Sequence, residues 1–284
     1  MGASRIAIVV DSTATIPEEL VDHYDLHVVP QNLNWSGETL KDGIDITPDE
    51  FYERLGEAEE LPTTSQPSTG EFYEIFSEIR QDYDSIIGIF ISDKLSGTYS
   101  CAHAAAQMME DYPIDVINSK SASMGLGFIA LEAAKAIEAG KGHTEAVQAA
   151  SELIPKVRVM FVVDTLEFLH RGGRIGGAQR LLGTVLSIKP VLHLEDGRIE
   201  PLASVRTKRK ALGRVLELAE EEVAGKPGVH AAVLHAAVPE EATKFRDEVG
   251  ERLRVDELIL TDLSPVVGTH TGPGLVGLAY YVES

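Results

Sequence analysis

Short apolar runs rich in Val and Ile alternate along this chain with amphipathic stretches of helical length. Parallel strands need long crossover connections, usually helices, so this alternation favours a mostly parallel sheet with helices on both faces. In the first half, the apolar runs predict strands over 6–10, 26–33, 85–91 and 114–118. Helices are expected to begin at the capping boxes Thr47–Glu50 and Ser68–Glu71, and to run over 96–109 and 124–139.

The second half adds a hairpin to the same kinds of element. The Asp196-Gly197 pair between two alternating segments predicts an antiparallel turn, so the sheet here is expected to be mixed. Its predicted strands are 158–163, 185–194, 199–204, 228–235, 257–263 and 275–282, with helices over 207–223 and 239–253. For 284 residues we predict two α/β domains. Residues 1–156 form a three-layer unit with a mainly parallel sheet, and residues 157–284 carry the mixed sheet.

The balance of charge narrows the choice of partners. The chain carries 25 Lys and Arg against 45 Asp and Glu, a formal net charge of −20. A surface this acidic repels phosphate backbones and anionic headgroups, which argues against nucleic acid and polybasic membrane docking. The single cysteine, Cys101, fits a reducing compartment, and the apolar run at 6–10 is too short for a signal peptide or membrane span. We therefore expect a cytoplasmic protein without stable membrane insertion.

Signatures of familiar active sites are missing from the sequence. The chain has no Gly-x-Ser-x-Gly elbow, no phosphate loop and no His-Glu-x-x-His zinc motif. Gly125-x-Gly127-x-x-Ala130 has the form of a dinucleotide fingerprint, but five residues separate the preceding strand from Met124. Close packing of a helix on the sheet is the favoured interpretation. His230 and His235 fall on opposite faces of one predicted strand, and neither a metal nor an organic cofactor is expected.

Two hydroxyl-rich segments precede predicted helices, at 62–68 and 92–100. Ser68 and Ser96 are suitable N-caps, but capping needs neither the other hydroxyls nor Gly97, which lets another group approach the backbone. Hydroxyls together with free backbone N–H groups at a helix N-terminus favour a bound anion such as a carboxylate or phosphate. No residue beside these serines in the sequence resembles a base that would activate a nucleophile.

Basic groups stand out at three later places. His270, between two threonines, is either a structural histidine or a group that carries a proton or donates a hydrogen bond to an anion. Arg174 follows a predicted strand in a Gly-rich segment, where the alternative is a glycine-capped helix C-terminus. Arg206 opens a stretch, 206–210, with four of the 25 basic residues, which is suited to phosphate or an acidic partner surface.

Taken in order, five motifs resemble the DegV family over nearly the whole chain, from about Arg5 to Val282. They are Asp11-Ser12-Thr13, Thr63-Thr64-Ser65-Gln66-Pro67-Ser68, Leu95-Ser96-Gly97-Thr98-Tyr99, Gly172-Gly173-Arg174-Ile175 and His270-Thr271-Gly272-Pro273-Gly274. The resemblance implies an N-terminal α/β domain with a parallel sheet, a smaller C-terminal α/β domain, and a long-chain fatty acid buried in a tunnel. Characterised members of this family present that lipid to the ATP-binding subunit of bacterial fatty acid kinase.

The resemblance also implies where the ligand lies. Thr64 and Ser96 match the threonine and serine that hold the carboxylate of the fatty acid. Residues 1–156 would accordingly bind the carboxylate, and residues 157–284 would bind the acyl chain. The fatty acid is then the bound ligand, and no cofactor is implied.

Further matches concern transfer of phosphate. Arg174, Arg206 and His270 match the groups that surround the carboxylate and are implicated in phosphoryl transfer with the kinase subunit, and we expect His270 to bind the carboxylate as well. At Asn118-Ser119, family members commonly have Asp-Ser, so no carboxylate role carries over to this chain.

Three functions are consistent with the sequence. Because the chain has no ATP-binding loop, a fatty acid carrier would need a separate kinase subunit for acyl-phosphate formation and would not be an enzyme on its own. A fatty-acid-binding buffer or regulator without a kinase partner would share the same binding residues. The third is an enzyme in its own right, either a serine hydrolase acting through Ser96 or a dinucleotide-dependent oxidoreductase.

Overall fold

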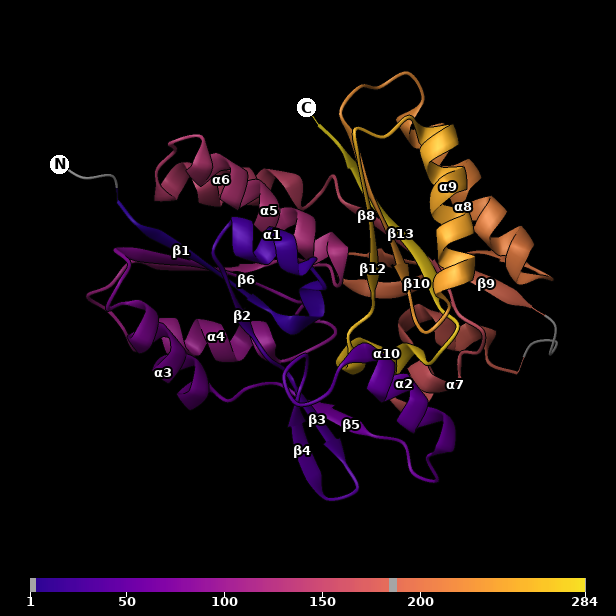
Figure 1. Cartoon of the computed structure of the whole chain (residues 1–284), viewed down its shortest axis with the longest axis horizontal. Coiled ribbons are helices and arrows are strands. Elements are labelled where there is room, and N and C mark those ends of the chain that lie inside the picture. Colours follow the sequence, from indigo (N-terminus) through magenta and orange to yellow (C-terminus); the bar gives the residue numbers. More distant parts are fainter. Residues whose placement is uncertain (1–3, 184–187, 284) are drawn as a thin grey trace.

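A computed structural model describes residues 4–183 and 188–283, which fold around two larger sheets (Figure 1). The first is a parallel sheet of four strands in the order β2 (Leu26–Val29), β1 (Ile6–Asp11), β6 (Ser85–Phe90) and β7 (Ile114–Asn118). Helices α3 (Thr69–Ile79) and α4 (Thr98–Gln107) cover one face, and α1 (Glu18–His23), α5 (Met124–Glu138) and α6 (His143–Leu153) cover the other. The predicted parallel sheet between helical layers is confirmed.

The second sheet has six strands, in the order β10 (Arg198–Val205), β9 (Lys189–Glu195), β8 (Arg158–Val162), β13 (Val276–Val282), β11 (Val229–His235) and β12 (Glu257–Asp262). Only β11 and β12 pair in parallel, so the predicted mixed sheet and its Asp196-Gly197 hairpin are confirmed. Residues 185–187 of the strand predicted over 185–194 lie outside the described residues. Helices α8 (Lys208–Val223) and α9 (Pro239–Leu253) pack on one face.

The strand predicted over 26–33 is wrong, because the chain divides at Pro30 into two strands that join different sheets. Proline has no N–H to donate and a fixed φ, so it interrupts a strand pairing. After it, β3 (Asn32–Trp35) pairs antiparallel with β4 (Glu38–Lys41) and β5 (Thr63–Ser65) in a small third sheet. Near this sheet lie helices α2 (Pro48–Glu57), α7 (Glu167–Arg171) and α10 (Pro265–Thr271) (Figure 1).

The helix starts follow the predicted capping residues with one exception. Both capping boxes form, with Thr47 accepting from the amide of Glu50 and Ser68 from the amide of Glu71. Ser96 is not the N-cap of α4, because that helix begins at Thr98 after Gly97. Gly97 is the N-cap, and Ser96 lies one residue before it. Short 3₁₀ helices cover Ser12–Ala14 and Gly176–Leu181, and no helix in the described parts of the chain combines the length and apolar character needed to span a bilayer.

One apolar core connects the two larger sheets. It combines side chains of β1 and β6, most of α5, and the inward residues Val159 and Phe161 of β8. Met160 and Val162 point to the other face and pack with α8 and α9 in a second cluster, as the alternation of a strand requires. The division into domains at residues 156 and 157 stays a prediction, since this core runs across it.

Gly125 shows why the glycines of α5 are needed there. They lie inside a helix and not in a strand-to-helix turn, so the dinucleotide fingerprint is not formed. A Cβ on Gly125 would come within 2.2 Å of the Ser121 Oγ and 2.5 Å of a Val159 methyl. The close helix packing expected from the sequence is confirmed.

Gly125→Ala is expected to lower the free energy of unfolding by about 1–3 kcal/mol, because the added methyl has no room. The matched control is Gly213→Ala in the middle of α8, where a Cβ would meet nothing within 4 Å. There the gain in helix propensity should raise stability by about 0.5–1 kcal/mol. Urea unfolding of both variants measures the difference, and equal effects would contradict the packing argument.

Candidate ligand-binding site

A cavity lies between the carboxyl edge of the parallel sheet and the inner face of the mixed sheet. It holds about 870 Å³ of empty space, counting its open mouth. The mixed sheet supplies most of an apolar wall, made chiefly of Val159, Phe161, Leu194, Ile199 and Leu234, with Leu275 just before β13. The first half of the chain supplies most of the polar lining, including Thr13, Gln31, Thr64, Gln66, Ser96 and Ser123. The cavity is therefore apolar on one side and rich in hydrogen-bonding groups on the other.

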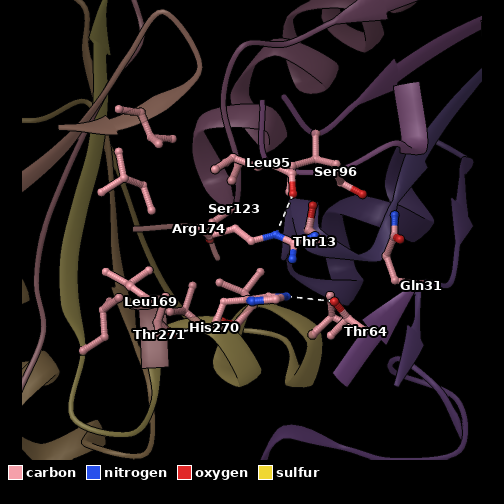
Figure 2. Close-up of a pocket in the computed structure, with 18 of the residues that line it drawn as sticks. Thr13, Gln31, Thr64, Leu95, Ser96, Ser123, Leu169, Arg174, His270 and Thr271 are labelled. Carbon is pink, nitrogen blue, oxygen red and sulfur yellow. Dashed lines mark hydrogen bonds between the residues drawn. The ribbon is translucent and has the colours of Figure 1, made fainter. Parts of the chain in front are cut away.

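Thr64 and His270 meet at the polar end of this cavity. Thr64 lies in β5, and His270 lies in the last turn of α10, 206 residues later. The Thr64 Oγ1 and the His270 Nε2 are 2.8 Å apart, a hydrogen bond drawn in Figure 2. The two side chains that the sequence singles out at opposite ends of the chain thus form one unit.

His270 is neutral near pH 7. Burial and the nearby Arg174 guanidinium lower the pKa of His270 to about 4. Its buried Nδ1 has no hydrogen-bond partner among the described residues and lies against Gly172, where a Cβ would come within 2.2 Å of it. Of the roles that the sequence leaves open for His270, carrying a proton near neutrality does not fit these surroundings, because no acidic group offsets its burial. The alternative, that it donates a hydrogen bond to an anion, is compatible with a neutral ring.

Arg174 brings a cation to the same end of the cavity. It follows α7, and its Nε donates to the Leu95 carbonyl at 3.0 Å while Nη1 donates to the Gly172 carbonyl at 2.7 Å. Figure 2 shows Arg174 and His270 extending from the second half of the chain toward Thr13 and Thr64. The guanidinium is about half-buried, and burial lowers its pKa from the ordinary arginine value. A bound anion would restore the favourable interaction that burial removes.

Ser96 lines the cavity beside these groups. Its Oγ lies 2.8 Å from the Thr98 Oγ1 and accepts from the Thr98 amide at 3.4 Å. Within the described chain these bonds involve no histidine, so the arrangement lacks the base that a serine nucleophile needs. Gly97 allows the close approach expected from the sequence, since a Cβ there would come within 2.8 Å of the Gln66 Nε2.

Other predicted residues lie apart from this cluster. Arg206 is exposed just after β10 and is not among the described residues that line the cavity. Asn118 and Ser119 form a turn, in which the Asn118 Oδ1 accepts from the amide of Lys120 and the Ser119 Oγ accepts from the amide of Ser121. Neither side chain is among the cavity-lining residues that the structure describes.

The two histidines of β11 have separate surroundings. His230 contacts Glu257 at 3.0 Å and Glu283 at 2.8 Å, whereas the Nδ1 of His235 lies 3.0 Å from Asp262. Residues 4–183 and 188–283 contain no group of three or more His, Cys, Asp or Glu side chains placed to hold a metal ion.

Comparison with known proteins identifies the family. A family model described as "Uncharacterised protein, DegV family" matches residues 5–283. Protein DegV of Bacillus subtilis is 36% identical over 277 residues, covering 97% of this chain and 99% of the relative. A fatty-acid-binding DegV family protein from Thermus thermophilus superposes with a TM-score of 0.93 at 37% identity, covering 98% of this chain and all of the other. The structure of DegV from Bacillus subtilis, described as a fatty acid binding protein, gives a TM-score of 0.92 at 35% identity over 99% and 100% of the two chains. The chain therefore belongs to the DegV family.

Sequence reasoning missed part of the polar lining. Gln31 and Ser123 face the cavity, but they occur beside a proline and inside a turn where no pattern marks them. Thr98 lies in the hydroxyl-rich segment at 92–100. Its role differs from that of Ser96 because α4 begins at Thr98, and the sequence does not show where that helix begins. The helix α10 was missed as well, because the Gly-Pro-Gly that follows it suggested a turn alone.

The titration of His270 gives a direct test of these electrostatics. The ring is expected to take up a proton only as the pH falls toward about 4. The unfolded chain keeps the ordinary pKa of 6.5, so the contribution of His270 to stability is complete above pH 6.5 and is lost as the pH falls to about 4. Histidine NMR of the lipid-free protein measures the ring, with His270→Gln used to assign its signal. A midpoint near 6.5 would contradict the described surroundings.

Proposed function

We propose that this protein binds a long-chain fatty acid in the cavity and presents its carboxylate to a separate ATP-dependent kinase subunit for acyl-phosphate formation. The observation that carries the proposal is the cavity itself, apolar along the mixed sheet and ending at Thr64, Ser96, Arg174 and His270. Fatty acid binding by the relatives from Thermus thermophilus and Bacillus subtilis supports the same ligand class.

The chemistry of the lining suits a fatty acid. Each buried CH₂ contributes roughly 0.8 kcal/mol to binding, so burial of the acyl chain against the apolar wall of the mixed sheet would supply most of its binding free energy. A carboxylate removed from water needs donors, which the hydroxyls of Thr64 and Ser96 provide. Arg174 supplies a positive charge nearby. Neutral His270 would act on the carboxylate through Thr64: its Nε2–H donates to the Thr64 Oγ1, which leaves the hydroxyl hydrogen of Thr64 for the anion. In this arrangement residues 1–156 bind the carboxylate, and residues 157–284 bind the chain.

Presentation to a kinase explains the cations better than binding alone. In the proposed reaction a carboxylate oxygen of the fatty acid attacks the γ-phosphorus of ATP held by the partner, and ADP leaves. Arg174 would neutralise the charge of the transferring phosphoryl group, and exposed Arg206 would contact phosphate or the acidic surface of the partner. We place the protein in the cytoplasm, where ATP and a reduced Cys101 are both found.

The test combines the protein, stearic acid, ATP and the candidate kinase subunit. Acyl phosphate, trapped as a hydroxamate, is expected only when both proteins are present. At saturating stearic acid, Arg174→Ala should still bind the lipid through Thr64, Ser96 and the apolar wall but form no acyl phosphate, and Arg174→Lys should restore part of the rate. Formation at the same rate without the kinase subunit would overturn the carrier proposal. Lipid binding with no product in any combination would favour the buffer or regulator.

A further inference from the structure

We propose that Thr98 and Gln31 are positioning residues that fix the direction of the Ser96 hydroxyl, so that its hydrogen points into the cavity toward an anionic head group. The inference rests on the proposed function, because it concerns how the same cavity recognises a carboxylate. Thr98 is fully buried at the start of α4 and is not among the described residues that line the cavity. Its effect on a ligand would therefore pass through Ser96.

The row of hydrogen bonds begins at Asp11, which is fully buried at the end of β1. Its carboxylate accepts from the Thr13 amide at 3.0 Å, the Ile91 amide at 2.8 Å and the Thr13 hydroxyl, and it interacts with the Gln31 side chain. Burial raises the pKa of Asp11, and these hydrogen bonds oppose that rise. With donors on both of its oxygens, Asp11 acts as an acceptor, and hydrogen bonding by the Gln31 side chain is among the influences that lower its pKa.

Gln31 sets the direction of the next bond. Its Nε2 lies 2.8 Å from the Thr98 Oγ1, and an amide nitrogen can only donate, so Thr98 accepts here. Among the described residues, Gln31 and Ser96 are the partners of the Thr98 hydroxyl. A buried hydroxyl whose hydrogen is unused costs free energy, so the hydrogen of Thr98 is donated to the Ser96 Oγ, 2.8 Å away.

Ser96 is then left with its own hydrogen. Its oxygen already accepts from the hydroxyl and the amide of Thr98, and its side chain lines the cavity. The remaining O–H is free to donate to a ligand. A carboxylate is an acceptor only, so it is the head group that this orientation suits. Without the relay, part of the binding free energy would be spent on turning the hydroxyl.

The experiment is a double-mutant cycle on lipid-free protein with stearic acid as the probe. Thr98→Val keeps the shape of Thr98 but removes the hydroxyl, and we expect it to raise the Kd about 3- to 10-fold. In a Ser96→Ala background the same change should leave the Kd unaltered, because there is no hydroxyl to orient. Thr98→Ser should restore parent affinity. Gln31→Met is a second variant that removes the amide donor. Because Gln31 also lines the cavity, only the part of its effect that passes through Ser96 should disappear in the Ser96→Ala background.

The outcomes separate the inference from the function on which it rests. A parent protein that does not bind stearic acid would overturn both. A parent that binds, and that loses affinity on Ser96→Ala, keeps the proposed function. In that case the inference is overturned if neither Thr98→Val nor Gln31→Met changes the Kd. It is equally overturned if their effects persist undiminished in the Ser96→Ala background, since they would then act on the structure in general.

Discussion

Stearic acid should bind a Thr64→Val, Ser96→Ala double variant more than about 100-fold more weakly than the parent, with each single change costing about 10- to 100-fold. These two hydroxyls come from different parts of the chain and both belong to the polar lining of an otherwise apolar cavity. Without these hydroxyls, the carboxylate of the bound fatty acid is removed from water but has lost two hydrogen-bond donors. The free-energy cost of this uncompensated desolvation lowers the affinity. Isothermal titration of delipidated protein measures the loss.

The control for this prediction is the neighbouring residue. Thr63 precedes Thr64 in β5 and is exposed on the opposite face of the strand, so Thr63→Val changes the same kind of group without touching the cavity. It should leave the Kd within about twofold of the parent. Equal affinity in the parent and the double variant would mean that the carboxylate lies elsewhere.

Val159→Phe should shorten the longest acyl chain that the protein accepts. His270 lies before the start of β13, and Arg174 lies after the end of β8. These two antiparallel strands meet with Val276 opposite Val162, so this edge of the sheet is the one nearest the polar end of the cavity. Val159 pairs with Ala279, three positions or about 10 Å farther from that polar edge, so it lies in the deeper part of the cavity. Filling this part displaces about four CH₂ groups, which at roughly 0.8 kcal/mol each amounts to about 200-fold in the Kd for stearic acid.

The matched measurement uses a shorter ligand on the same variant. Hexanoic acid is shorter than the distance between the polar edge and Val159, so Val159→Phe should leave its Kd unchanged. Ile199→Trp, at another position of the same apolar wall, provides a second variant if overpacking against Gly125 prevents the first from folding. A proportional loss for both acids would contradict the assignment of Val159 to the deep end.

Much of the fold follows from local signals in the sequence. The strands of both larger sheets are apolar runs. The capping boxes at Thr47 and Ser68 predict the starts of α2 and α3, because a capping box joins residues only three positions apart. The small sheet of β3, β4 and β5 was missed because its strands are only three or four residues long and partly polar. Their pairing depends on contacts between distant segments, which a periodicity of two residues does not reveal.

The sequence predicts most of the residues of the site but not how they are arranged. The motifs predict Thr64, Ser96, Arg174 and His270, and the structure brings all four to the lining of one cavity. The motifs also predict Arg206, but this residue is exposed after β10. The neutral state of His270 depends on its burial beside Arg174. The proposed roles of Gln31 and Thr98 depend on a hydrogen bond between residues that are 67 positions apart in the sequence. Burial and long-range contacts of this kind are properties of the folded chain alone.

The central claim, that this cavity holds a fatty acid, is tested most directly by native mass spectrometry of the purified protein followed by lipid extraction. A single fatty acid per chain is predicted for the parent, and the Thr64→Val, Ser96→Ala variant should carry little or none. A parent chain that remains lipid-free after exposure to a mixture of long-chain fatty acids would contradict the account.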